Sequence, residues 1–234
     1  MGGYANNKQI VTDGLSFIVD PANGLSDDGT STVKDLSGGL SLTKYNTITT
    51  STDGGVSWGL SSGSDRIGCS TNVMSGKSNF SMGAWAKPFN NNSDGTVFGR
   101  WANGEDVLML WWDVGGTSNF RLIARDSSTG GALFTSDTTA CGTVNQWNHI
   151  LFTWDAANNE IKLYLNGVLN QTATNNSLAI KTGTTGFGIG NQYGTSGSSN
   201  RTFNGVIGPV YAYDKTLTAS EVAHNYDTHK NRFS

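Results

Sequence analysis

The chain has 234 residues, of which 36% are hydrophobic, and this length suits one domain with a sizeable core. Charged residues make up only 14% of the chain, against about 25% in ordinary globular proteins. The formal net charge is -3 and the chain has no run of Lys or Arg, which argues against DNA, RNA and anionic membranes as partners. Stretches of about 18 apolar residues are missing, as is a signal-peptide pattern at residues 1–7, so we expect neither membrane insertion nor export by this N-terminus.

Short runs of β-branched and aromatic residues, separated by Gly, Ser, Asn and Asp clusters, recur along the whole chain and predict strands. Many of these runs alternate between apolar and polar residues, so each sheet should bury one face, and two sheets must stack. The predicted strands are 15–20, 41–45, 56–60, 66–69, 80–87, 96–101, 107–113, 120–125, 147–155, 160–166, 168–172, 186–190 and 203–213.

Two local patterns are more detailed. Residues 156–159 and the pair Asn166 and Gly167 supply tight reversals, which predict a three-stranded meander over 147–172. Thr218 and Glu221 have the spacing of a capping box and predict one short helix, from 218 to about 228. It is the only helix that we expect.

Cysteine and histidine are rare. Cys69 and Cys141 permit one disulfide at most, and they say nothing about the cellular compartment. The three histidines, His149, His224 and His229, do not have the spacing of a zinc site.

Five segments in sequence order carry a resemblance to a known family: 80–88, 147–155, 161–167, 203–211 and 216–222. Together they resemble the laminin-G-like domains of the concanavalin A-like lectin/glucanase jelly roll, over about residues 14–228. The resemblance implies an all-β fold, an antiparallel two-sheet jelly-roll sandwich with one short C-terminal helix.

The N-terminal part refines this expectation. Residues 14–20, followed by 35–38, further resemble the stand-alone domains of bacteriophage and marine-virus structural proteins. We divide the chain into an N-terminal arm, 1–13, and the jelly-roll domain, 14–234. Because the arm has only Ile10 and Val11 as an apolar pair, it need not belong to the core. It is either a disordered terminus or a segment that packs on a neighbouring subunit.

Acid/base chemistry lacks its usual residues. Glycosidases need two carboxylates about 5–9.5 Å apart, and in the hydrolases that the chain resembles these lie in a Glu-x-Asp-x-Glu run. Glu105, Glu160 and Glu221 form no such run, and no Asp-x-Asp pair lies on a predicted strand. We therefore predict that the protein is not an enzyme and assign no catalytic residue.

Residues 100–113 are the strongest candidate for ligand binding. Trp111 and Trp112 are neighbours on a predicted strand and point to opposite faces, so at least one ring leaves the core or covers its edge. An exposed indole beside polar groups could hold a neutral sugar; the alternative is that both rings are buried between sheet and loop. The candidate ligand-binding residues are Arg100, Trp101, Asp106, Trp111, Trp112, Asp113 and Tyr193.

The resemblance also implies a calcium site. Asp106 falls where laminin-G-like domains often carry a calcium carboxylate, and Asn191 lies near the expected second ligand. Two positions do not complete the six to eight oxygens that calcium takes. We therefore assign no cofactor and keep calcium only as a candidate at Asp106 and Asn191. We assign four other aromatic residues to packing: Trp85, Trp147, Trp154 and Tyr164.

The expected function rests on the family resemblance. We expect a non-enzymatic accessory structural protein of a viral particle, a head-decoration or knob-like component with lectin-like adhesion to glycans. Its partners would be capsid or tail proteins and cell-surface glycans, and it would lie on the particle surface after assembly in the host cytoplasm. The alternatives are a secreted carbohydrate-binding lectin module and a glycoside hydrolase or polysaccharide lyase of the same fold.

Overall fold

The structure is a computed structural model. It describes residues 9–61, 63–90, 95–100, 107–112, 119–125, 132–137, 144–174, 186–192 and 201–234. For 107–109, 125 and 132–137 it describes the backbone alone.

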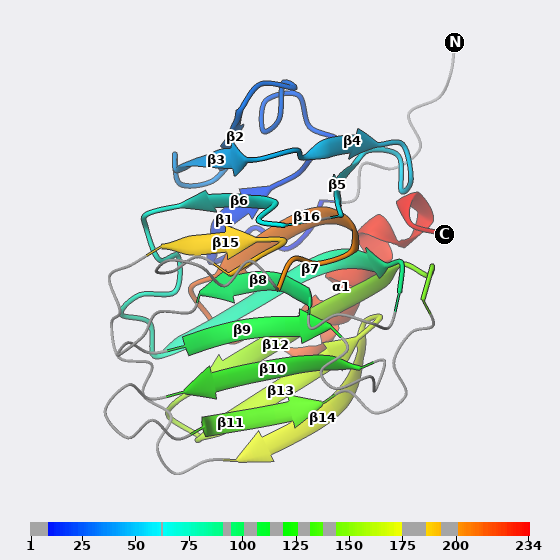
Figure 1. The fold of residues 1–234 in the computed structure, drawn as a ribbon. Helices are drawn as coiled ribbons and strands as arrows, with labels where there is room; N and C mark the ends of the chain where they lie inside the picture. Colours follow the sequence, from blue (N-terminus) through cyan, green and yellow to red (C-terminus); the bar gives the residue numbers. More distant parts are fainter. Residues whose placement is uncertain are drawn as a thin grey trace.

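Two antiparallel sheets form the sandwich (Figure 1). The first, sheet A, comprises β1 (Leu15–Val19), β4 (Thr49–Ser51), β5 (Ser57–Leu60), β7 (Asn79–Pro88), β12 (Asn148–Asp155), β13 (Glu160–Leu165), β14 (Val168–Thr174) and β16 (Gly205–Tyr213). Their order is β14-β13-β12-β7-β16-β5-β4, and β1 pairs with the C-terminal half of β16.

The second sheet, sheet B, places strands side by side that are far apart in the sequence, because β15 lies between β8 and β6. Its strands are β2 (Thr32–Lys34), β3 (Ser41–Tyr45), β6 (Arg66–Cys69), β8 (Gly95–Arg100), β9 (Val107–Trp112), β10 (Phe120–Arg125), β11 (Ala132–Asp137) and β15 (Phe187–Ile189). The order is β11-β10-β9-β8-β15-β6-β3-β2. Near the C-terminus the chain forms helix α1 (Ala219–His229) and the 3₁₀ helix η1 (Lys230–Arg232).

The predicted fold is confirmed. The strands β12, β13 and β14 form the expected meander, with Asn166 and Gly167 both at positive φ in its second turn. Helix α1 begins with the complete capping box of Thr218 and Glu221. Three short or polar strands, β2, β4 and β11, were not predicted. No helix among the described residues is long and apolar enough to cross a membrane.

The main core lies between the two sheets and follows from period-two alternation. On β7, Phe80, Met82 and Ala84 point inward and are fully buried. Phe80 meets Phe152 of β12 edge-on, with ring centroids 5.7 Å apart. Such pairs add to the free energy gained from burying apolar area.

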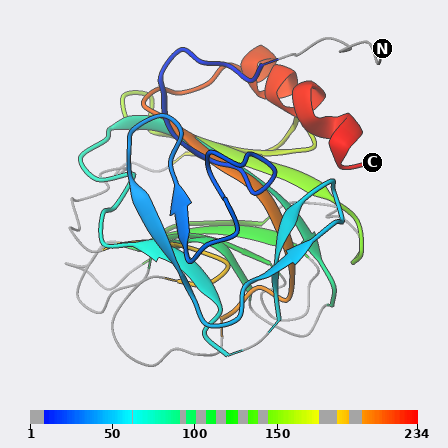
Figure 2. The same ribbon diagram turned by 90° about the horizontal axis from the view of Figure 1, so that it is seen from above.

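A second core lies on the outer face of sheet A, where helix α1 covers the strands. Figure 2 shows the helix against one side of the sandwich. The same alternation that fills the main core therefore leaves a second set of large side chains facing the helix. The fully buried members of this second core are Leu151, Tyr164, Tyr211, Tyr213, Leu217 and Val222.

Residues 9–13 belong to the fold, although the sequence suggested that residues 1–13 need not. Ile10 is buried, and the amide of Val11 donates to Asn225 Oδ1 at 2.9 Å. The other end of the Asn225 amide donates to the Tyr213 hydroxyl at 2.9 Å. This fully buried asparagine joins the N-terminal segment, helix α1 and sheet A, because a buried amide must find partners.

His149 lies beneath helix α1 with no exposed surface, and its Nε2 is hydrogen bonded to the Tyr211 hydroxyl. Its ring packs against Trp85 at 5.2 Å between centroids and against Tyr226 at 5.9 Å. Burial, with a smaller contribution from His229, lowers the pKa of His149 to about 3. The imidazole is therefore neutral in the folded protein at ordinary pH.

This histidine should make folding pH-dependent. An unfolded His149 titrates near 6.5 and the folded one near 3, so the unfolded state binds more protons between these values. The stability should be fully present above pH 6.5 and should fall by about 1.4 kcal/mol per pH unit below it. Urea unfolding at several pH values between about 6.5 and 4.5 measures this slope. His149→Gln should make the slope shallower, and His229, whose pKa burial also lowers, should supply part of the slope that remains. His224→Gln, at an exposed position of α1, is the control. Equal slopes in all three proteins would contradict the assignment.

Candidate functional site

The predicted tryptophan pair divides between the two faces of sheet B. Trp112 points into the core at 1% exposure, packs against Phe120 at 4.8 Å and donates from Nε1 to Asn90 O at 2.9 Å. Trp111 points the other way, but it is only 4% exposed and the guanidinium of Arg201 lies 4.1 Å from its ring centroid. Neither ring therefore offers an open face for a ligand.

Of the other predicted ligand-binding residues, the structure describes Arg100 alone. The side chain of Arg100 is fully buried. Four of the predicted positions lie outside the described residues: Trp101, Asp106, Asp113 and Tyr193.

Asn191 uses both ends of its amide within the protein. Its Nδ2 donates to Thr202 Oγ1 at 2.9 Å, and its Oδ1 accepts from the amide of Gln192 at 2.8 Å. Groups of three or more His, Cys, Asp or Glu with metal-binding geometry are not found in the described part of the chain. Because Asp106 lies outside that part, the calcium site stays a prediction.

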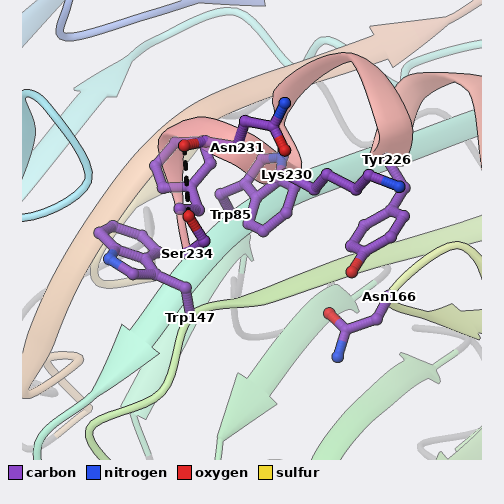
Figure 3. Close-up of a pocket in the computed structure, with 8 residues that line it drawn as sticks. Trp85, Trp147, Asn166, Tyr226, Lys230, Asn231 and Ser234 are labelled. Atoms are coloured by element: carbon purple, nitrogen blue, oxygen red, sulfur yellow. Dashed lines mark hydrogen bonds between the residues drawn. The ribbon is translucent and has the colours of Figure 1, made fainter.

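A pocket of about 220 Å³ lies on the outer side of sheet A, between the C-terminal end of α1 and the strands β7 and β12 (Figure 3). We call it the aromatic pocket. Its lining combines four aromatic rings with four polar side chains from distant parts of the chain. The lining residues are Trp85, Trp147, Asn166, Tyr226, Lys230, Asn231, Phe233 and Ser234.

The aromatic rings pack against one another and form the wall. Phe233 stacks on Trp85 with centroids 4.4 Å apart, and it meets Trp147 at 4.6 Å in a tilted arrangement. Tyr226 also stacks parallel to Trp85, at 5.6 Å. The Phe233 ring needs the space beside Gly54, since a Cβ there would lie 2.6 Å from it. Trp85 is fully buried, whereas Trp147 and Tyr226 are half-buried and can meet a ligand.

Asp53 fixes the orientation of the Trp147 indole. The indole Nε1 donates to Asp53 Oδ1 at 2.8 Å, and Lys87 Nζ donates to Asp53 Oδ2 at 2.6 Å. Burial raises the pKa of Asp53, but the hydrogen bonds from Lys87 and Trp147 outweigh this effect, so its pKa lies below the usual value. The carboxylate is therefore ionised at neutral pH and remains an acceptor for the indole.

Arg232 anchors the segment that carries Phe233. Its Nη1 donates to both carboxylate oxygens of Asp20 at 2.9 Å. Its Nε donates to the carbonyl oxygen of Gly54 at 2.8 Å, and its Nη2 donates to that of Val56 at 2.6 Å. A planar guanidinium that donates hydrogen bonds in several directions has a defined position. The C-terminal turn is thus tied to the loop before β5 and to the residue after β1.

Polar groups form the rim of the aromatic pocket. Asn166 Oδ1 accepts from the His149 amide at 2.9 Å, which holds this side chain at the end of β13. Figure 3 shows the Tyr226 hydroxyl directed toward Asn166. Asn231 and Ser234 are exposed, and Lys230 lies beside Tyr226 with its Nζ 5.8 Å from the ring centroid.

Such a pocket suits a small amphipathic ring. Tryptophan and tyrosine combine apolar faces with a polar end, and ligand pockets usually add a few polar groups that fix orientation. The volume of 220 Å³ is below the roughly 300–1,000 Å³ of sites for larger ligands. It therefore suits one ring-sized group.

Sequence reasoning assigned Trp85 and Trp147 to packing, and the structure shows that both also line the pocket. One signal was present. Trp85 shares the parity of Ser81, Gly83 and Lys87 on β7, so a large ring stands on a face of otherwise small or polar residues. The contributions of Tyr226 and Phe233 depend on how α1 and η1 dock, which no local pattern predicts.

Comparisons with known proteins place the chain in a family. The family model of the concanavalin A-like lectin/glucanases superfamily matches residues 61–223. No curated protein matches by sequence. Among solved structures, a Trypanosoma rangeli sialidase is similar with a TM-score of 0.68 and 16% identity over 96% of this chain; the match spans about a third of that enzyme, 34%.

Two further structures match over most of this chain. Domain 4 of an extracellular arabinanase from Geobacillus stearothermophilus, solved with arabinotriose, has a TM-score of 0.61 and 22% identity, covering 92% of this chain and 98% of that domain. The receptor-binding domain of botulinum neurotoxin D has a TM-score of 0.69 and 18% identity, covering 92% and 52%. These identities show a shared fold. The family model matches more than half of this chain, and the chain therefore belongs to the concanavalin A-like lectin/glucanases superfamily.

Proposed function

We propose that this domain is a non-enzymatic carbohydrate-binding module and that the aromatic pocket holds one ring of the glycan. The observation that carries the proposal is the pocket itself, with half-buried Trp147 and Tyr226 beside polar side chains. Sugar rings have an apolar face of C–H groups and an edge of hydroxyls. An aromatic wall with a polar rim complements both.

The pocket is organised before any ligand arrives. Asp53 holds the Trp147 ring through its indole N–H, and Arg232 holds the turn that places Phe233 behind it. A binding site that is already ordered loses less conformational entropy when it binds. This preorganisation supports recognition of a small ligand.

The similar structures support the same proposal. The arabinanase domain was solved with arabinotriose, and another botulinum neurotoxin D structure, 19% identical to this chain, contains N-acetylneuraminic acid. Both proteins were therefore solved with a bound saccharide, and the match spans 98% of the arabinanase domain and 51% of the neurotoxin chain. The proposal extends this use of the fold to the present chain.

The positions of the two glutamates in the described part of the chain, Glu160 and Glu221, support a binding role without catalysis. Glu160 pairs with Lys162 at 2.5 Å, and Glu221 caps helix α1 and pairs with Lys215 at 2.7 Å. Among the described residues, the lining of the aromatic pocket includes no Asp or Glu side chain. A glycosidase needs two carboxyl groups at the scissile bond, and this lining supplies neither.

The binding proposal predicts which rings matter. Trp147→Ala and Tyr226→Ala should each weaken binding to oligosaccharides on a glycan array by tenfold or more, which corresponds to about 1.4 kcal/mol. The reason is that each change removes an aromatic wall of the pocket. Tyr45→Ala is the control, since Tyr45 is an exposed aromatic residue on sheet B. Thermal unfolding verifies that each variant is folded, and Trp147→Phe, which keeps a ring, should retain part of the binding. Unchanged array profiles in both alanine variants would refute the proposed site.

The absence of catalysis is tested by product release. Incubation with laminarin, agarose, alginate and host polysaccharides should release no reducing ends and no unsaturated products, because the pocket lining lacks a carboxylate pair. The positive control for each polysaccharide is an enzyme known to cleave it. Release that disappears after replacement of Glu105 or Asp106, which lie outside the described residues, would contradict this part of the proposal.

We also propose the narrower role suggested by sequence resemblance, an accessory protein on the surface of a viral particle that adheres to glycans. Mass spectrometry of purified particles should then detect this chain at a constant copy number relative to the capsid protein. A glycan-binding chain that is absent from particles and is recovered from the culture medium would instead favour a secreted lectin module.

A further inference from the structure

We infer that the aromatic pocket selects electrically neutral sugar rings over acidic ones. This inference rests on the proposed glycan-binding function and names its ligand class. It comes from the ionic groups in and around the pocket. Within the described residues, each cation close to the pocket already has a carboxylate partner from the chain.

The cation of the lining is compensated on its own helical turn. Lys230 Nζ lies 2.7 Å from Asp227 Oδ1, and the two side chains are about equally exposed, at 47% and 46%. Residues three apart on a helix are neighbours, so Asp227 stays within reach of Lys230 whenever this segment is folded. A ligand carboxylate would have to compete with this aspartate.

The two cations behind the wall are compensated more completely. Arg232 is bound to the carboxylate of Asp20 and to two backbone carbonyls. Lys87 is bound to Asp53 at 2.6 Å, and the same carboxylate accepts from Trp147. Most of the surface of both ion pairs is shielded from water. Each carboxylate therefore stays with its cation, because separating the two would leave a poorly hydrated charge without a partner.

The nearby histidines add no positive charge. Burial lowers the pKa of His229; Asp20 opposes this shift and Arg232 adds to it. His149, beneath Tyr226, is fully buried and neutral. Neither imidazole therefore supplies a cation for an acidic ligand at neutral pH.

This pairing of charges determines the free energy cost of binding an acidic ring. An acidic sugar would lose hydration of its carboxylate on entering the pocket, and it would find no uncompensated cation there to offset the loss. A neutral sugar loses no ionic hydration and keeps the contacts with Trp147 and Tyr226. The pocket should therefore discriminate against the acidic ring by desolvation.

The test uses a glycan array that pairs neutral oligosaccharides with counterparts carrying a uronic acid or N-acetylneuraminic acid. The full chain should bind neutral members, and the affinity should change by less than about twofold between roughly 50 and 500 mM NaCl, since no ion pair forms with the ligand. Asp227→Asn should release Lys230 and raise binding to acidic members by threefold or more, with neutral binding unchanged. Asp214→Asn is the matched control. Asp214 lies on the turn after β16 and also pairs with a lysine, Lys77, but neither residue lines the pocket.

The outcomes separate this inference from the function on which it rests. Preferential binding of acidic members by the unmodified chain, weakened by salt and lost in Lys230→Gln, would overturn the inference and leave glycan binding in place. The inference also fails, with glycan binding intact, if Asp227→Asn gains nothing for acidic members. Binding to no member of the array would overturn both the inference and the proposed function.

Discussion

Helix α1 buries the outer face of sheet A, and the candidate site depends on this contact. The sheet presents Tyr211, Tyr213 and His149 on that face, and their polar atoms require partners once water is excluded. Asn225 of the helix supplies one hydrogen bond to the sheet and another to the N-terminal segment. With the helix fixed in this way, the turn that follows it can reach Trp85 and complete the aromatic pocket.

The pocket shows how a fold residue can also serve a site. Trp85 is fully buried and stacks with Phe233 and Tyr226, so its first role is packing. This packing nevertheless determines where the half-buried rings of Trp147 and Tyr226 stand. The polar support of Asp53 then fixes the indole without adding an uncompensated charge to the wall. The contacts that stabilise this part of the fold therefore also position the rings of the aromatic pocket.

Alternating patterns predicted most of the fold, because the side-chain period of a strand is a local property. The meander, its Asn-Gly turn and the capping box of α1 were all readable for this reason. The short strands β2 and β4 were not predicted, because three residues are too few to show an alternating pattern. The aromatic pocket was not predicted from the sequence, because it depends on how Tyr226 and Phe233 dock against Trp85. The neighbouring Trp111 and Trp112 were predicted to bind a ligand, but Trp112 is buried in the main core and Arg201 covers the ring of Trp111.

The link between Arg232 and Asp20 joins residues 212 positions apart in the sequence. Closing a loop of this length costs conformational entropy, although this cost grows only slowly with loop length. The aromatic pocket can therefore form only after the two ends of the domain have come together. The environment of Trp147 therefore reports on whether the two ends of the domain have come together, because Phe233 packs against its ring.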